Sequence, residues 1–200
     1  TNTVTGSPVS VPSAPKTMVM GPNGLLYVSA ASRVYEIDPR TLTIRGEFVV
    51  NGTPSKLIFT PDGKRAIAIN TTPSSGVVLS LLDIGARSVA GTLAYTFLSV
   101  PVDKIIMASN NRAFVYSQST KKIYDLTLDP FKMDTVNFLG LDIGALTLTS
   151  FAVTEELPRA TYLFVGDAGN LYRLDPVGNK YLEKLPLSAP QGDLAVNGLN

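Results

Sequence analysis

The chain has 200 residues, a formal net charge of +1 and charged side chains at only 16% of positions. Because the charge is near neutral and the largest basic cluster is Lys121-Lys122, neither nucleic acid nor an anionic membrane surface is expected as a partner. The lack of Cys and His excludes disulfides and thiolate metal sites and removes the commonest general base, and no apolar run approaches the roughly eighteen residues that membrane insertion of a helix needs.

Residues 1–13 are polar and contain two prolines, and we expect them to form a linker or a single edge strand. The first of several repeats follows, because APKTMVMGPNG (14–24) matches TPSKLIFTPDG (53–63) position for position. In the second occurrence of this motif, Pro61 sets φ for a type I turn and Gly63 adopts a left-handed φ at little steric cost. Both stretches therefore predict a short apolar strand and a tight turn that leads into a second strand.

The first repeat continues with predicted strands at 25–29, 33–39 and 42–50, and a bulge is expected at Gly46. In the second repeat, Ala66 and Ala68 alternate with isoleucines, and such small residues let neighbouring sheets approach closely. The strands predicted for the later repeats are 57–59, 66–69, 77–82 and 88–95 in the second, one within 101–111 and then 112–116, 122–127 and 135–139 in the third, and 146–153, 160–165, 170–176 and 181–185 in the fourth.

The repeats have a period of about 44 residues, which is typical of a four-stranded β-propeller blade. Four aspartates at strand ends support this period, because Asp38, Asp83, Asp129 and Asp175 are 45, 46 and 46 residues apart. An alternative register aligns Tyr35, Tyr124 and Tyr172, and the sequence leaves both registers open. We predict an all-β fold, a β-propeller or partial propeller, with blades at 14–52, 53–99, 100–144 and 145–188 and the start of a fifth at 189–200.

The stretch VYEIDPRTLTIRGEF, followed by VVNGTPSKLIFTPDGKRAIAIN, resembles the YVTN/NHL-type propeller repeats of bacterial and archaeal surface and secreted proteins. The resemblance is good over 14–95, recognisable over 160–200 and weak over 96–159. It implies a propeller fold and an extracytoplasmic setting (secreted, periplasmic or cell surface). Because such proteins include binding scaffolds and a few enzymes, it implies little about activity.

Closure of the ring has three possible solutions, because propellers usually need more than four blades and an open ring exposes an apolar blade face. The chain is either part of a longer protein, one half of a homodimer with four blades from each copy, or a compact four-bladed ring completed by the N-terminal strand.

No motif points to catalysis, a metal or a cofactor. The four recurrent aspartates are predicted to hold turns by accepting backbone N–H groups. GDAGN (166–170) lacks the carboxylates of a calcium loop and is predicted to be a hairpin turn. The serines have no G-x-S-x-G context and no His to act as base. The recurrent tyrosines are predicted to pack between blades, and Asn51 and Asn70 each begin an N-glycosylation sequon.

If the chain binds a partner, propeller geometry places the binding face on the loops between second and third strands and between blades. We therefore predict a non-enzymatic scaffold of a secreted or surface protein that contacts a protein or carbohydrate ligand through these loops. The alternative is a propeller enzyme, a lactonase-like hydrolase or lyase, with a metal site in the central channel. The candidate binding residues are Asn51, Thr71, Thr72, Ser74, Ser117, Ser119, Asp167 and Asn170.

Overall fold

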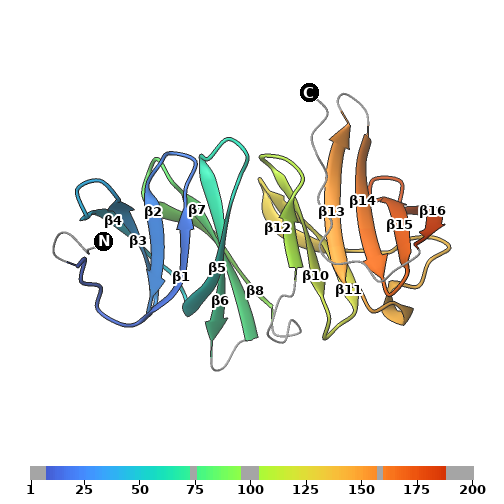
Figure 1. Cartoon of the computed structure of the whole chain (residues 1–200), viewed down its shortest axis with the longest axis horizontal. Helices are drawn as coiled ribbons and strands as arrows, with labels where there is room; N and C mark the ends of the chain where they lie inside the picture. The colour runs from blue at the N-terminus through green and yellow to red at the C-terminus, as the bar shows by residue number, and fades with distance from the viewer. Residues whose placement is uncertain (1–7, 73–75, 96–103, 157–159, 188–200) are drawn as a thin grey trace, which may run out of the picture. The chain divides into compact units, whose positions relative to one another are not determined.

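The computed structural model describes residues 8–72, 76–95, 104–156 and 160–187, and the chain divides into two compact units, Thr1–Ala94 and Tyr95–Asn200 (Figure 1). Each unit contains two four-stranded antiparallel sheets in which the strand order follows the chain. The four sheets lie within the four predicted repeats. The predicted all-β architecture of successive four-stranded meanders is therefore confirmed.

In the first unit, sheet 1 consists of β1 (Pro15–Met20), β2 (Leu26–Ala30), β3 (Arg33–Asp38) and β4 (Thr43–Val49). Sheet 2 consists of β5 (Thr53–Phe59), β6 (Arg65–Thr72), β7 (Gly76–Asp83) and β8 (Ser88–Tyr95). The bulge expected at Gly46 is present. Gly46 pairs with Glu36 and Ile44 pairs with Ile37, so Arg45 is the extra residue between them.

In the second unit, sheet 3 consists of β9 (Lys104–Met107), β10 (Arg112–Ser117), β11 (Lys122–Leu128) and β12 (Phe131–Val136). Sheet 4 consists of β13 (Ser150–Glu156), β14 (Ala160–Asp167), β15 (Asn170–Asp175) and β16 (Lys180–Pro186). A short 3₁₀ helix, η1 (Ile143–Ala145), lies in the connection between the two sheets.

The turn between β5 and β6 forms as its sequence predicts. Gly63 has φ of +68° and donates its N–H to the carbonyl of Thr60. The Asp62 carboxylate accepts the Thr60 hydroxyl at 2.7 Å and the Lys64 N–H at 3.1 Å. The equivalent Gly24 between β1 and β2 has φ of +75°, so a glycine closes both turns for the same steric reason.

The two registers left open by the sequence agree on which face of a sheet each residue occupies. Tyr35, Tyr124 and Tyr172 are each the third residue of the third strand, opposite a valine of the second strand. The distance from the tyrosine to the recurrent aspartate is three residues in sheets 1 and 4 and five in sheet 3. An insertion of two residues preserves the side of a strand on which later residues lie, so in all three sheets the residue before the aspartate shares the face of the tyrosine.

We call this face the rear face of a sheet and the other the forward face. The residue before the recurrent aspartate lies on the rear face in every sheet, and it is buried in each case: Ile37, Leu82, Leu128 and Leu174.

In the first unit, the forward face of sheet 1 packs on the rear face of sheet 2. Tyr27 and Phe48 of sheet 1 share a core with Leu57, Ala66 and Ala68 of sheet 2. The two alanines are fully buried in this core. The rings of Tyr27 and Phe59 meet edge to face with centroids 4.9 Å apart.

In the second unit, the forward face of sheet 3 packs on the rear face of sheet 4. Phe114 and Ile123 of sheet 3 share one core with Leu163, Val165 and Tyr172 of sheet 4. Tyr172 therefore packs between sheets, as predicted, and its burial raises the pKa of its phenol.

The connection at 137–149 differs from the prediction. The sequence analysis places strands at 135–139 and 146–153, but β12 ends at Val136 and β13 begins at Ser150. Phe138, Ile143, Leu146 and Leu148 point into the core of the unit. The strand pairing described along this stretch is a single parallel bridge between Leu139 and Lys180. The burial of alternate residues from Leu146 onward produces the two-residue period of a strand, although a core contact rather than a neighbouring strand is its cause.

Residues 8–13 also have a definite place, although they form no strand. Val9 and Val11 pack against a buried cluster on the rear face of sheet 1 that contains Val28, Tyr35 and Ile37. In sheet 1, the position next to the interblade tyrosine is thus occupied by the N-terminal segment.

Candidate functional site

Three predicted binding residues of the first unit lie at one end of sheet 2. Thr71 and Thr72 end β6, and Asn51 is exposed in the connection from β4 to β5. Gly52 lies directly against them, since a Cβ atom built there would be 2.6 Å from the Thr71 carbonyl oxygen and 2.6 Å from Thr72 Cγ2. The structure therefore brings Asn51, Thr71 and Thr72 together, with a glycine required at the point of contact. Ser74 lies outside the described residues.

The two glycosylation sequons differ in accessibility. Asn51 is exposed, whereas Asn70 is fully buried and donates its amide to the Ser80 hydroxyl at 2.8 Å. Asn70 is therefore a core residue of the folded protein, and only Asn51 presents its side chain at the surface.

In the second unit, the loop from Ser117 to Lys121 between β10 and β11 is held in place by two tyrosines. Tyr116 donates its hydroxyl to Gln118 Oε1 at 2.7 Å, and Tyr124 donates its hydroxyl to Thr120 Oγ1 at 3.0 Å. Ser117, a predicted binding residue, is fully buried, and its Oγ lies 2.8 Å from that of Ser119. Ser117 therefore lies buried at the base of the loop, whereas Ser119 is exposed at its surface.

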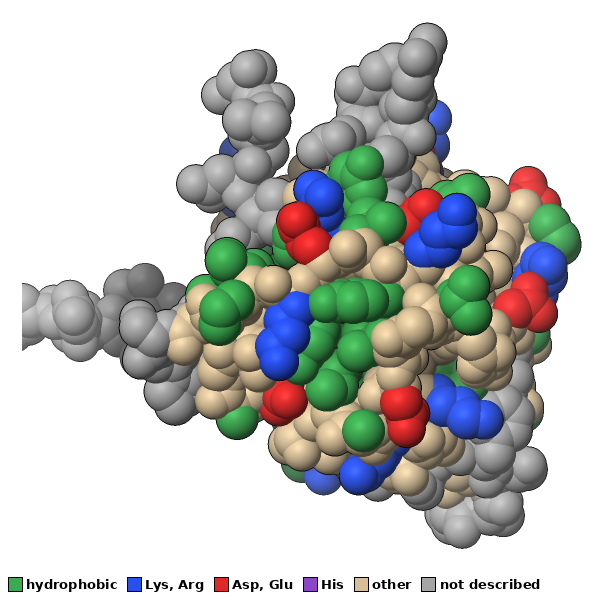
Figure 2. Space-filling model, turned by 90° about the vertical axis from the view of Figure 1, so that its right-hand side faces the viewer, with side chains coloured by type: hydrophobic (Ala, Val, Ile, Leu, Met, Phe, Trp, Pro, Cys, Tyr) green, Lys and Arg blue, Asp and Glu red, His purple; other side chains and the backbone are tan. Residues whose placement is uncertain are grey.

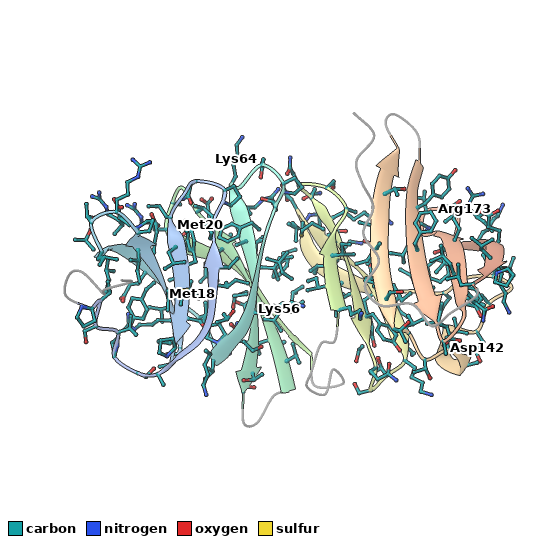
Figure 3. All side chains as sticks on the ribbon, viewed as in Figure 1. Met18, Met20, Lys56, Lys64, Asp142 and Arg173 are labelled. Carbon is teal, nitrogen blue, oxygen red and sulfur yellow. The ribbon has the colours of Figure 1, made fainter. Side chains whose placement is uncertain are left out.

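A pocket of about 220 Å³ adjoins this loop. One wall comes from Thr120, Lys121 and Lys122, and the other from the connection between β12 and β13, including Asn137 and Asp142. Asp142 (labelled in Figure 3) caps η1 by accepting the Gly144 N–H at 2.9 Å, which fixes its carboxylate at the pocket rim. A shallower hollow of about 650 Å³ continues along the same connection to Gly178 and Asn179.

Asp167 and Asn170 form a pair across the tight turn between β14 and β15. Asp167 accepts the N–H of Ala168 at 2.7 Å with its side chain and the N–H of Gly169 with its carbonyl. The predicted hairpin at GDAGN is therefore confirmed, and the Asp167 carboxylate is engaged in holding it.

Three of the recurrent aspartates hold the turn after the third strand, as predicted. Asp38 accepts the N–H of Arg40 at 2.9 Å, Asp83 that of Ala86 at 2.8 Å, and Asp175 that of Val177 at 2.9 Å. The hydrogen bond from Arg45 and that from the Arg40 N–H lower the pKa of Asp38 below its usual value. Asp129 begins the turn between β11 and β12.

Among the described residues, no three Asp or Glu side chains lie close enough together to share a metal ion. No helix in the described part of the chain has the length and apolarity needed to cross a membrane.

The pocket beside Thr120 and Asp142 is not predicted from the sequence. Part of the connection at 137–149 is predicted as strand, and a run of mostly apolar residues carries no signal for a pocket wall. Asp142 followed by Ile143-Gly144 was the available signal, because an Asp before a short helical turn is a capping residue.

No family model matches the chain, and no curated protein matches it. Solved structures do resemble it. The β-propeller domain of Cps50 (Swd1) from Myceliophteria thermophila aligns with a TM-score of 0.65 at 11% identity, covering 95% of this chain and 60% of that one. Hydrazine synthase from Kuenenia stuttgartiensis aligns with a TM-score of 0.63 at 14% identity, covering 90% of this chain and 64% of that one. U3-55K aligns with a TM-score of 0.55 at 8% identity, covering 86% and 52%.

These likenesses show the fold. The chain is a β-propeller or partial propeller, and sheets 1 to 4 are four of its blades. It spans 52–64% of the length of the three solved structures.

Proposed function

We propose that this chain is a non-enzymatic binding scaffold that contacts a protein or a glycan through the loops between second and third strands and between blades. Within the first unit this surface consists of Asn51, Thr71 and Thr72. Within the second it consists of Ser119 to Lys122 with Asp142 across the pocket. Propellers such as those that this chain resembles present loops of variable sequence on a rigid scaffold, and such loops are where binding residues concentrate.

The observation that carries this proposal is the fixed loop beside the pocket. Two buried tyrosine side chains hold Gln118 and Thr120, so the loop is already ordered before a ligand binds. Preorganisation of this kind lowers the entropic cost of binding. The pocket rim offers an ammonium group, a hydroxyl and a carboxylate, which are groups that hydrogen-bond sugar hydroxyls and peptide amides.

We further propose that the chain is of the YVTN/NHL type and acts outside the cytoplasm, secreted, periplasmic or on the cell surface. Its support is the pattern of residues 34–70 and the use of Thr, Ser and Asn rather than charged residues for polarity. An antibody against the chain should label intact, unpermeabilised cells of the source organism. Labelling that requires permeabilisation would contradict this setting.

The binding proposal is tested by probing a glycan array and a peptide array with the purified chain. Lys121→Ala/Lys122→Ala and Thr71→Ala/Thr72→Ala each remove side chains from one part of the surface. We expect at least one of these double variants to lower affinity for the selected probe about tenfold, a loss of roughly 1.4 kcal/mol.

The matched control is Lys64→Ala, which removes an exposed lysine from the turn between β5 and β6, at the other end of its sheet (labelled in Figure 3). It should leave affinity unchanged. Unaltered binding in a variant that combines all four loop substitutions, or no binding to either array, would overturn the proposal.

A further inference from the structure

The exposed large hydrophobic side chains of the described residues are confined to sheets 1 and 4 and the connections beside them. They are Met18, Met20, Leu42, Ile44, Val49, Leu139, Val177, Leu182 and Leu185. Their counterparts inside the units are buried, as Leu57 of sheet 2 in place of Met18 and Val136 of sheet 3 in place of Leu185 show. Exposed apolar groups gathered on a sheet face mark a surface that packs against something else.

On sheet 1 the apolar surface is the rear face. Met18 pairs with Val28, and Ile44 pairs with Ile37, so their side chains share the face that carries Tyr35. Val9 and Val11 cover its centre, yet Met18 is 61% exposed and Met20 is 55% exposed. Both methionines project from β1 (Figure 3). The N-terminal segment therefore leaves the flank of this face open.

On sheet 4 the apolar surface is the forward face. Phe164 pairs with Ala152, and Leu171 pairs with Leu185, which is 55% exposed. Figure 2 looks onto this side of the second unit and shows hydrophobic side chains gathered at its centre, with basic and acidic side chains around them.

Phe164 is equivalent to Tyr27 of sheet 1 and to Phe114 of sheet 3, since each precedes the valine that pairs with the third-strand tyrosine. Those two rings are fully buried because another sheet covers them, whereas Phe164 remains partly exposed.

The charged residue on the same face of sheet 4 is paired within its own sheet, whereas its counterpart in sheet 1 is bridged to the next sheet. The residue after the third-strand tyrosine is Glu36 in sheet 1 and Arg173 in sheet 4. Arg87, from the turn after β7 in the next sheet, reaches Glu36 with Nε at 3.1 Å and Nη2 at 3.2 Å. Arg173 Nε is buried and lies 3.1 Å from Glu183 Oε1, but it has no hydrogen-bond partner among the described residues.

We propose that the forward face of sheet 4 in one copy of this chain packs against the rear face of sheet 1 in a second copy, forming a head-to-tail homodimer. Both sheet packings inside the units join a forward face to a rear face, so the two open faces are of the kinds that pair in this molecule. Each open face carries one Arg–Glu pair, Arg173–Glu183 or Arg33–Glu47, and the two faces therefore do not repel each other.

The number of blades in such a homodimer is within the range of known propellers. Two copies supply eight sheets, at the upper end of the range of about four to eight blades in known propellers. In a two-fold dimer the same contact forms twice, which closes the assembly. This association does not use the loops of the proposed binding surface.

The test is the absolute mass in solution, measured by light scattering after gel filtration over a range of concentrations. We expect twice 21.3 kDa for the wild type. Met20→Lys on the rear face and Leu185→Lys on the forward face should each shift the protein to the monomer mass. Val177→Lys, at a residue 68% exposed on the turn after β15, is the matched control and should remain dimeric.

An equimolar mixture of the two monomeric variants separates head-to-tail pairing from pairing of a face with itself. Met20→Lys retains its forward face and Leu185→Lys its rear face, so the mixture should dimerise where neither variant alone does. Because the chain contains no Cys, Met20→Cys and Leu185→Cys can be mixed and treated with a bis-maleimide, which should join unlike copies more than like copies.

A wild-type mass of 21.3 kDa at every concentration would overturn the proposal. So would a dimer that both lysine variants leave intact, or a cross-linked product made mainly of like copies. Circular dichroism of each variant shows whether it is folded. If a lysine variant is unfolded, cross-linking of the cysteine variants tests the proposal instead, because these variants add no charge.

Discussion

At the scale of single residues, the contact between Glu36 and Arg87 joins two blades. The Glu36 side chain is 3% exposed and that of Arg87 is 51% exposed, so the carboxylate is taken out of water and the guanidinium remains half in it. The hydrogen bonds to Glu36 raise the pKa of Arg87 above its usual value. A buried carboxylate left without its partner is costly, because its desolvation is no longer compensated.

We therefore expect Arg87→Ala to lower the free energy of unfolding, because it leaves the buried Glu36 carboxylate without its charge-assisted hydrogen bonds. Urea unfolding followed by tyrosine fluorescence measures this loss. The control is Arg45→Ala, which removes an exposed arginine from Asp38 and should cost less than about 1 kcal/mol. Equal losses in the two variants would contradict a special role for Glu36.

Gly46 provides a second way to disturb the same pair. A Cβ atom at Gly46 would lie 2.7 Å from Arg87 Cδ, so a glycine at this position makes room for the arginine. The sequence indicated only a bulge at Gly46, because the side chain that crosses it comes from 41 positions further along the chain, in the next sheet.

At the scale of elements, the turn from Thr60 to Arg65 is held by one carboxylate. The Thr60 hydroxyl and the Lys64 N–H lower the pKa of Asp62 below 3.8, its ordinary value. A carboxyl group with a lowered pKa in the folded state stabilises that state at pH values above its unfolded pKa, and this contribution is lost as the pH falls through the folded pKa.

We therefore expect Asp62→Ala to be less stable than the wild type at neutral pH, and the difference to shrink as the pH falls below 3.8. Melting temperatures of both proteins, measured at matched pH values, give this difference directly, and effects of other titrating groups cancel. Because Asp62 is exposed, we expect a shift of a few degrees at most. A difference that is constant with pH would contradict the role of the charged carboxylate.

Most elements of this fold were predictable from the sequence, and the reason lies in their local chemistry. The turns at Gly24 and Gly63 and the strands that flank them depend on residues adjacent in the chain. The connection at 137–149 was not predictable, because Phe138, Leu146 and Leu148 are buried against residues of both sheets of the second unit. Its alternating burial resembles a strand, and only the missing neighbour shows otherwise.

The same limit applied to the candidate site. Loop positions such as Asn51 and Ser119 follow from the repeat, and both are exposed. The burial of Ser117, the last residue of β10, does not follow from the repeat, because burial depends on the packing of the folded unit. The pocket at Thr120 and Asp142 depends on a connection that only the folded unit defines.

At the scale of the whole molecule, residues 8–13 cover part of the rear face of the first blade. Val9 and Val11 alternate with exposed residues and pack on Val28, Tyr35 and Ile37. A blade face that carries an interblade tyrosine is apolar, and its exposure to water is unfavourable. The N-terminal segment is therefore part of the folded first unit.

We expect the double variant Val9→Asp/Val11→Asp to lower the free energy of unfolding by about 2 kcal/mol, because two partly buried apolar side chains are replaced by charges at an apolar face. Ser10→Asp is the matched control, since Ser10 lies between the two valines and is exposed, and it should change stability by less than about 0.5 kcal/mol. Tyrosine fluorescence suits the measurement, because the chain contains no Trp and Tyr35 lies beneath the segment. If the double variant were as stable as Ser10→Asp, the segment would be a linker, as its composition first suggested, and the rear face of sheet 1 would need no cover from its own chain.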